Sequence, residues 1–330
     1  MSPMLARRLT RPAETARLLA IRWLPLGLRW RLLGLVAPLR RLATGGPDPA
    51  AWQRELDVIA PPPSAPPVDP WLGGDSLPRV SVLIVTHDNA GLTALCLDSL
   101  DRFTAYPDLE VVVVDNASSD DTPAMLRARA ASDPRLMVVL EPVNRGFAAG
   151  CNRAAREASG EVLCFLNNDT VLTPGWLGPL VTTLEDEPGV GLVGPVSNGV
   201  ANEARVRGSY RTLAELLAFA EDHARRHRGR SFSIPMLALY CAALRRSVWE
   251  QVGPLDEAFG LGLFEDDDYA RRLRRAGLDL VCHEEAFVHH WQQASFDRMA
   301  RQRYLELYER NRRYLREKWS AETGSGSGGA

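Results

Sequence analysis

A chain of 330 residues with 45% hydrophobic and 24% charged residues has the composition of a globular protein, long enough for one large domain or two small ones. The net charge of −2 hides an asymmetry, because residues 1–50 carry nine arginines against only Glu14 and Asp48, and the rest of the chain is acidic. The five cysteines are odd in number, scattered and without a CxxC pair, which argues against a disulfide framework and against a zinc site.

Residues 1–58 are predicted to form a basic amphipathic arm. Arginines recur among apolar residues between positions 5 and 42, and three of them interrupt the longest apolar stretches: Arg22, Arg29 and Arg31. The stretch therefore cannot span a bilayer as it stands, and it lacks a cleavable signal pattern. Such a pattern is typical of a helix in the headgroup region of an anionic membrane, although the helix could instead pack on the protein's own body. We expect a cytoplasmic protein that is peripheral on the inner face of the plasma membrane.

Residues 59–78 contain seven prolines and are predicted to be an extended linker. Beyond it, short apolar runs alternate with helical stretches, which is the signature of a parallel sheet with helices on both faces. The predicted strands are Val80–Val85, Val111–Val114, Leu136–Leu140, Val162–Leu166 and Val190–Val193. We therefore expect a doubly wound, mostly parallel α/β domain over residues 79–296. Residues 297–330 are predicted to hold an arginine-rich helix, Arg298–Trp319, and a flexible tail.

Polar residues follow the predicted strands, and ligands of such folds bind beyond the carboxyl ends of the strands. The segments are Thr86-His87-Asp88-Asn89, Asp115-Asn116-Ala117-Ser118, Asn144-Arg145-Gly146 and Asn167-Asn168-Asp169. Asp115 ends a run of four valines, where a carboxylate can accept hydrogen bonds from a nucleotide base or a ribose hydroxyl. The same pattern also arises where a buried strand meets a turn.

The Asn167-Asn168-Asp169 segment indicates a metal site more sharply. A carboxylate beside amide oxygens at the mouth of a sheet offers the hard oxygen ligands that Mg²⁺ and Mn²⁺ prefer, with substrate phosphates completing the shell. The alternative is an Asx-rich turn before Pro174.

Four consecutive acids, Glu265 to Asp268, begin a predicted helix. They could simply complement the helix macrodipole. Clustered carboxylates repel one another, however, and a metal or a proton-accepting role would offset that repulsion. His289 and His290 follow the apolar stretch 286–288, where histidines are more often structural but could supply a metal ligand beside an acidic site.

The chain resembles the family 2 glycosyltransferases with the GT-A fold, in the bacterial branch of rhamnosyl- and galactofuranosyltransferases. Seven motifs occur in the family's order: VSVLIVT (80–86), VVDNASSD (113–120), NRGFAAGCN (144–152), FLNNDT (165–170), GPLDE (253–257), FEDDD (264–268) and VHH (288–290). The resemblance covers roughly residues 79–319. It implies an inverting transfer of a sugar from a nucleotide-diphosphate donor to a hydroxyl of a glycan or lipid-linked saccharide, in cell-surface polysaccharide assembly.

The resemblance also implies roles for particular residues. The expected nucleotide-sugar-binding residues are Thr86, Asp88, Asp115, Asn144, Arg145, Gly146 and Asn168. The family's D-x-D metal motif falls on residues 167–169, so Asp169 and Asn167 are expected to hold Mg²⁺ or Mn²⁺, with His290 favoured over His289 as a further ligand. Asn167 stands where the family's first acid would be. Asp266 is expected to be the catalytic base, and Glu265 and Asp268 to bind the acceptor.

Other classes fit the sequence less well. A nucleotidyltransferase normally begins with a glycine-rich phosphate loop and a lysine, but Lys318 is the only lysine of the chain. A dinucleotide-dependent dehydrogenase needs G-x-G-x-x-G after the first strand, which residues 86–91 lack. A non-catalytic membrane-associated scaffold remains an alternative, and no nucleic-acid partner is expected. The processive synthases of the family carry transmembrane helices and a Q-x-x-R-W element, so single or limited addition is favoured.

Overall fold

A mixed eight-stranded sheet forms the centre of the protein. The computed structural model describes residues 48–59, 77–291 and 301–324. The strands of the sheet are β1 (Val80–Thr86), β2 (Leu109–Asn116), β3 (Leu136–Glu141), β4 (Val162–Asn167), β6 (Val190–Val196), β7 (Ser231–Ser233), β8 (Cys241–Arg245) and β9 (Asp279–Phe287). Their order is β3-β2-β1-β4-β8-β6-β9-β7. A separate two-stranded ladder pairs β5 (Thr170–Val171) with β10 (His289–His290).

The five predicted strands are confirmed as β1, β2, β3, β4 and β6, and the fold class is the expected mostly parallel α/β type. Strands β3, β2, β1 and β4 form a parallel ladder. The sequence pattern did not reveal β8, which runs antiparallel between β4 and β6. Its short apolar run has the same composition as a buried parallel strand, and its direction depends only on the partners it meets.

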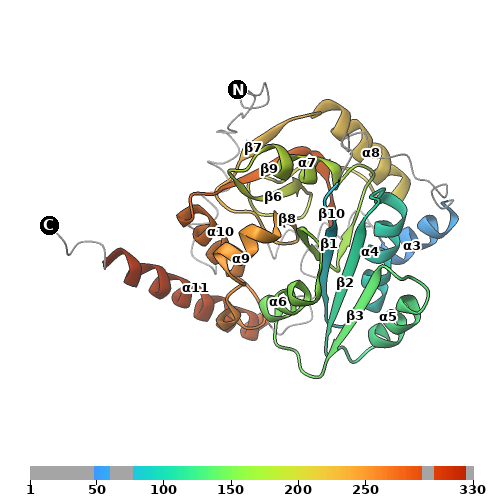
Figure 1. Ribbon diagram of the computed structural model, residues 1–330. Helices are drawn as coiled ribbons and strands as arrows, with labels where there is room; N and C mark the ends of the chain where they lie inside the picture. The colour runs from blue at the N-terminus through green and yellow to red at the C-terminus, as the bar shows by residue number, and fades with distance from the viewer. Residues whose placement is uncertain (1–47, 60–76, 292–300, 325–330) are drawn as a thin grey trace.

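Helices cover both faces of this sheet. They are α4 (Ala90–Phe103), α5 (Thr122–Ala130), α6 (Phe147–Glu157), α7 (Gly178–Asp186), α8 (Leu213–Arg226), α9 (Arg246–Val252) and α10 (Glu265–Arg275). Helix α11 (Arg301–Gly324) extends away from the sheet (Figure 1). In Figure 1, α6 lies on one side of the β1–β3 part of the sheet, and α4 and α5 lie on the other. Among the described residues, no helix combines the length and the apolar character needed to cross a bilayer.

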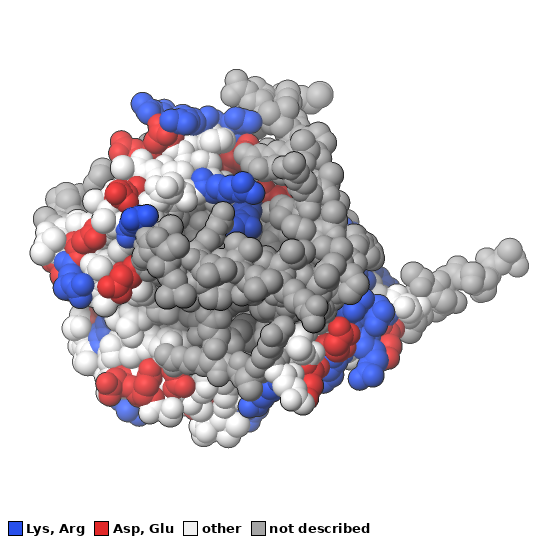
Figure 2. Space-filling view, turned by 180° about the vertical axis from the view of Figure 1, so that it is seen from behind, with Lys and Arg blue, Asp and Glu red and all other residues white. Residues whose placement is uncertain are grey.

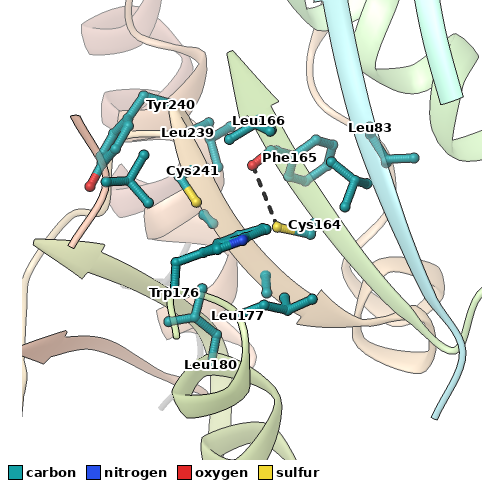
Figure 3. Packing of buried hydrophobic residues seen from close by; sticks show 14 of the residues in the cluster. Leu83, Cys164, Phe165, Leu166, Trp176, Leu177, Leu180, Leu239, Tyr240 and Cys241 are labelled. Atoms are coloured by element: carbon teal, nitrogen blue, oxygen red, sulfur yellow. Dashed lines mark hydrogen bonds between the residues drawn. The ribbon is translucent and has the colours of Figure 1, made fainter. Parts of the chain in front are cut away.

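The core lies between the sheet and these helices. All eight residues of β2 are buried, which explains why its valine run shows no alternation of polar and apolar residues. Figure 3 shows Trp176 between the strand residues Cys164 and Cys241 and the helix residue Leu180. Trp176 is only 1% exposed, and all five cysteines are buried. The strands that end at the polar segments are thus anchored in the buried core.

The end of the predicted N-terminal arm packs on this domain. Helix α3 (Pro49–Val58) lies against α4 and α8, and its residues Trp52 and Leu56 are buried, as expected for an apolar pair four positions apart. Trp52 Nε1 donates a hydrogen bond to the carbonyl of Arg211 at 2.7 Å. The expectation of an arm reaching to residue 58 is therefore corrected for residues 49–58, which pack on the protein's own body. The arm's residues 1–47 and most of the predicted linker lie outside the described residues.

Candidate functional site

The carboxyl ends of the central strands bring several predicted site residues to one edge of the sheet. In the parallel register, Thr86 lies opposite Asp115, and Val85 lies opposite Asn167. Asn168 Nδ2 donates to Thr86 Oγ1 at 3.1 Å and to Thr93 Oγ1 at 2.9 Å. Thr86 and Asn168 are both buried, so in this structure they connect β1, α4 and the end of β4 beneath the edge.

Asp115 and Asp88 lie at the neighbouring strand ends. Asp115 Oδ2 accepts a hydrogen bond from the Ser118 amide at 3.2 Å, whereas Asp115 Oδ1 is buried without a hydrogen-bond partner among the described residues. A buried carboxylate oxygen normally has a partner, so this atom is a candidate acceptor for a ligand N–H or O–H. Asp88 adopts a left-handed backbone with φ of 57°, and its carboxylate accepts from the Ser119 amide at 2.7 Å. That hydrogen bond is the main cause of the lowered pKa of Asp88.

The loop Asn144-Arg145-Gly146 is held from β2 by Asn116, a strand-end residue to which the sequence assigned no role. Its Oδ1 accepts from the Arg145 amide, and its Nδ2 donates to the Gly146 carbonyl, both at 3.0 Å. Asn144 Oδ1 accepts from the Gly146 amide at 2.9 Å. The side chain of Arg145 stays exposed at the rim, where it can meet an anionic ligand. Asn116 directly follows Asp115 in the strand-end segment, but only the structure shows that its side chain reaches this loop.

Asn167, Asp169 and His290 converge on one another. His290 Nε2 lies 3.1 Å from Asp169 Oδ1 and 3.5 Å from Asn167 Nδ2. The other amide atom, Asn167 Oδ1, is buried without a hydrogen-bond partner among the described residues. Burial lowers the pKa of His290, but the charge and hydrogen bond of Asp169 raise it by more than burial lowers it. The pKa of His290 is therefore raised above its ordinary value. Asn167 and His290 are 123 positions apart in the chain. They meet because β10 pairs with β5, the short strand that follows β4.

His290 is fixed in place by residues that follow β6 and by the residue that precedes β8. Its Nδ1 lies 2.9 Å from the carbonyl oxygen of Gly199. A carbonyl oxygen can only accept a hydrogen bond, so Nδ1 carries the hydrogen. Asn198 accepts from the His290 amide at 2.9 Å and donates to its carbonyl at 3.1 Å. The Tyr240 ring stacks on the imidazole at 5.0 Å between centroids. Asn198 was missed by the sequence reading, although it follows β6 as the other site residues follow their strands.

His289 faces the other way. It is packed among aromatic rings, 4.9 Å from both the Trp52 and Trp291 centroids, and its Nδ1 lies 2.9 Å from the Tyr210 hydroxyl. Burial lowers its pKa to about 3. Successive residues of a strand point to opposite sides, so only one histidine of the pair can meet Asp169. The structure places His290 there.

The converging donor set fits a divalent cation. It offers the Asp169 carboxylate, the unsatisfied Asn167 Oδ1 and the Nε2 of a histidine whose Nδ1–H is held by a carbonyl, which is the usual arrangement behind a metal-ligating histidine. The described residues contain no group of three or more His, Cys, Asp or Glu side chains that could hold a metal, and here the third donor is an amide. Substrate oxygens would have to complete the shell of Mg²⁺ or Mn²⁺.

A second group of acids occupies the first turn of α10. Glu265 is 8% exposed and its Oε2 lacks a hydrogen-bond partner among the described residues, whereas Asp266 is half-buried. Asp266 Oδ1 accepts from the Asp267 amide at 2.8 Å. Desolvation, together with the charge of Asp267, raises the pKa of Glu265 to about 7. The pKa of Asp266 is raised well above its ordinary value by desolvation and by both neighbouring carboxylates. Such a carboxyl is suited to accept a proton near neutral pH.

Asp268 differs from Glu265 and Asp266 because its carboxylate has charged partners. Its side chain is fully buried and forms ion pairs with Arg272 at 3.0 Å and with Lys318 at 2.8 Å. Trp319 Nε1 donates to the same carboxylate at 3.0 Å. The acceptor-binding role expected for Asp268 is therefore corrected, because Arg272 of α10 and Lys318 and Trp319 of α11 already bind its carboxylate.

Comparison with known proteins supports one family. Residues 81–253 match the model of Glycosyl transferase family 2. The O-antigen biosynthesis protein RfbC of Myxococcus xanthus is 32% identical over 234 residues, which is 66% of this chain and 18% of that protein. The GalNAc(5)-diNAcBac-PP-undecaprenol beta-1,3-glucosyltransferase of Campylobacter jejuni is 30% identical over 106 residues, 32% of this chain and 34% of the relative. The chain spans less than a third of the length of the first curated relatives it matches.

A solved structure shares the fold. The mannosyltransferase PcManGT of Pyrobaculum calidifontis, in complex with GDP-Man and Mn²⁺, aligns with a TM-score of 0.50 and 24% identity over 73% of this chain and 64% of that one. The family model matches more than half of the chain, and the matched region contains the strand ends described above. The chain therefore belongs to glycosyl transferase family 2.

Proposed function

We propose that this chain is a metal-dependent, inverting glycosyltransferase that moves a sugar from a nucleotide-diphosphate donor to a hydroxyl group. The observation that carries the proposal is the meeting of Asn167, Asp169 and His290 at the edge of the sheet. Neither a scaffold nor a simple turn requires a buried carboxylate, an unsatisfied amide oxygen and an oriented histidine at one place.

The donor would lie across the strand ends. The unpartnered Asp115 Oδ1 would accept a hydrogen bond from the base or ribose, next to Asp88 on the neighbouring strand end. The loop of Asn144, Arg145 and Gly146 would lie beside the diphosphate or the sugar, with the Arg145 side chain supplying positive charge. Thr86 and Asn168 would shape this pocket from below, because their side chains already bond to each other.

Asp266 would act as the general base. A bound Mg²⁺ or Mn²⁺, held by Asp169, Asn167 and His290, would neutralise charge on the leaving diphosphate. The Asp266 carboxylate would take the proton of the acceptor hydroxyl while the hydroxyl oxygen attacks the anomeric carbon from the face opposite the diphosphate. The new C–O bond forms as the bond to the diphosphate breaks, so one displacement inverts the stereocentre. Glu265, beside the base, would contact the acceptor.

The substrates belong to cell-surface polysaccharide assembly in this proposal. Two relatives support it, one named for O-antigen biosynthesis and one named for glucosyl transfer to a PP-undecaprenol-linked saccharide. We infer a glycan or lipid-linked saccharide acceptor, and a donor of the rhamnosyl or hexosyl type, as in the bacterial rhamnosyl- and galactofuranosyltransferase branch that the motifs resemble.

A donor panel tests the proposed function directly. UDP-GlcNAc, UDP-glucose, UDP-galactofuranose, GDP-mannose and dTDP-rhamnose would each be incubated with the full chain and Mn²⁺, with released nucleotide diphosphate and thermal stabilisation as readouts. We expect one donor to be hydrolysed slowly with Mn²⁺ and not with EDTA. Binding of a donor without any hydrolysis or transfer would favour the non-catalytic scaffold. Release of pyrophosphate from a nucleoside triphosphate and a sugar phosphate would favour a nucleotidyltransferase.

Sugar transfer should lose rate in mild acid. A base must be unprotonated, and the pKa values of Asp266 and Glu265 lie above the ordinary carboxyl range, Glu265 at about 7. The rate should therefore be constant above the pKa of the base and fall about tenfold per pH unit below it. Initial rates at saturating donor across neutral and mildly acidic pH would show an acid limb well above pH ~4. An acid limb at the ordinary carboxyl value of about 4 would contradict the assignment.

The basic arm should hold the enzyme on an anionic membrane. Replacing Arg22, Arg29 and Arg31 with glutamine in the full chain removes three positive charges from the arm. These three residues lie outside the described residues. At about 1 kcal/mol per basic residue, liposome affinity should fall by roughly 100-fold at low salt. Co-sedimentation with phosphatidylserine-containing vesicles would measure this change, and donor hydrolysis should stay unchanged.

A matched control removes three exposed arginines from α11 instead: Arg303, Arg312 and Arg313. On the face seen in Figure 2, basic and acidic side chains of the described residues lie interspersed. In α11 the acids Glu306, Glu309 and Glu317 likewise lie among the arginines, so these arginines should contribute little to membrane binding. Equal losses in both triple variants, or no binding by the unaltered chain, would make the arm a packing or oligomerisation element.

A further inference from the structure

Helix α11 is built onto the chain segment that leads into the acidic turn of α10. Its buried face consists of Leu307, Asn311 and Leu315, spaced four residues apart. Two ring contacts flank this face, Tyr308 with Phe264 at 5.0 Å and Tyr314 with Phe259 at 5.1 Å between centroids. The helix therefore covers the segment 256–264, which includes the short 3₁₀ helix η2 (Glu257–Phe259).

Asn311 is the central contact. It is 0% exposed, and its Nδ2 lies within hydrogen-bond distance of three carbonyl oxygens, those of Phe259 at 2.8 Å, Gly262 at 2.7 Å and Leu263 at 3.1 Å. Arg310 adds a bond to the Phe259 carbonyl at 2.9 Å. One side chain of α11 thus satisfies backbone acceptors of a loop about fifty residues earlier in the chain.

That loop has a backbone that needs such support. Leu263 and Phe264 both have φ of 76°, and Gly260 and Gly262 also have positive φ. Non-glycine residues are strained in this region of backbone conformation and persist there only where surrounding contacts hold them. Phe264 immediately precedes Glu265 and Asp266, so its backbone conformation sets where the first turn of α10 begins.

The only lysine of the chain secures the other end of the segment. Lys318 Nζ lies 2.7 Å from Asp256 and 2.8 Å from Asp268, and thereby joins the residue before η2 to the first turn of α10. Tyr314 donates to the same Asp256 carboxylate at 2.8 Å, and Trp319 donates to Asp268 at 3.0 Å. Asp268 is fully buried and also pairs with Arg272, so losing Lys318 leaves this buried carboxylate with one of its two cations and leaves Asp256 without its lysine partner.

The same segment also contacts the donor loop. A Cβ atom at Gly146 would overlap the carbonyl oxygen of Gly260, and Gly146 has φ of 91°. The backbone of the predicted nucleotide-sugar loop therefore rests directly on the turn that α11 holds.

We propose that α11 is a positioning element of the active site, and that Asn311 and Lys318 hold the 256–264 segment so that the carboxylate of Asp266 keeps its place relative to the 144–146 loop, which Asn116 holds on β2. This inference rests on the proposed function. Asn311 and Lys318 touch no reacting atom, and act through the backbone and through Asp268. A misplacement of about 1 Å at a reacting group can lower a rate by roughly 100-fold.

Lys318→Met tests the proposal in the full chain, since Lys318 is partly exposed and its loss need not unfold the domain. The expected result is a roughly 10- to 100-fold lower kcat for transfer from the donor that the panel identifies. Binding of UDP with Mn²⁺ should change by less than about threefold, because the strand-end groups are untouched. Lys318→Arg should restore most of kcat, since it keeps the charge.

Asn311→Asp supplies the second variant, because it keeps the shape of the side chain but removes the two N–H donors. It should lower kcat as Lys318→Met does. Arg313→Gln on the exposed face of α11 is the matched control and should leave kcat unchanged. Wild-type kcat in a folded Lys318→Met protein would overturn the proposal. An equal loss of UDP–Mn²⁺ binding would also overturn it, because α11 would then only support the fold. Absence of any turnover by the unaltered chain would instead contradict the proposed function.

Discussion

Replacing Asp266 with asparagine should lower kcat for sugar transfer by roughly 10²- to 10⁴-fold while donor affinity stays nearly unchanged. The amide keeps the shape of the side chain, and its Oδ1 can still accept from the Asp267 amide, as in the structure. It cannot take the proton of the acceptor hydroxyl. Steady-state kinetics with the preferred donor, and titration of UDP in the presence of Mn²⁺, would separate the two effects.

The matched control for this prediction is Asp267→Asn, which removes a neighbouring charge from the same helical turn. It should lower kcat far less, by less than about tenfold, and it should move the acid limb to lower pH because a charge that raises the pKa of Asp266 is gone. Normal turnover by Asp266→Asn would transfer the role of the base to Glu265 or Asp267. Asp268 is no candidate, because its carboxylate is committed to Arg272 and Lys318.

Asp169→Ala should abolish transfer together with metal-dependent donor binding. Even an outer-shell partner of a metal ligand contributes roughly 10- to 100-fold to metal affinity, so losing the carboxylate itself should cost at least as much. The fold should survive, because the backbone of Asp169 keeps its bond to the Trp291 amide at 2.9 Å. Calorimetric titration of UDP with and without Mn²⁺ would show the loss only where the metal is present.

Two further variants sharpen this test. Asp169→Asn keeps the volume of the side chain and should retain the fold but not the Mn²⁺ dependence. Asp186→Asn removes a carboxylate from the exposed side of α7 and should change neither property. If Asp169→Ala binds UDP with the same Mn²⁺ dependence as the unaltered chain, then Asp169 is not a metal ligand and the Asn167–Asp169–His290 group is structural.

The sequence alone determined the strands β1, β2, β3, β4 and β6 and the polar character of the strand ends. It could do so because a strand buried on both faces is a continuous apolar run. Polar residues directly after such a run mark the carboxyl end of the strand. The order of the motifs indicated the family, because each motif is a short stretch of consecutive residues that can be recognised without knowing the fold. Asn167, Asp169 and His290 were named from these local patterns, and the structure brings them together.

Only the tertiary structure decided which of these residues face one another and which are buried in contacts with other parts of the fold. The run of acids at 265–268 looks uniform in sequence, yet its fourth member is fully buried because α11 supplies Lys318 and Trp319 from some fifty residues away. Trp52 likewise reads as part of a membrane-seeking arm until its ring is seen against His289. Periodicity reports that a side chain is buried, but not what it is buried against. That choice depends on contacts between distant segments, and these exist only once the chain has folded.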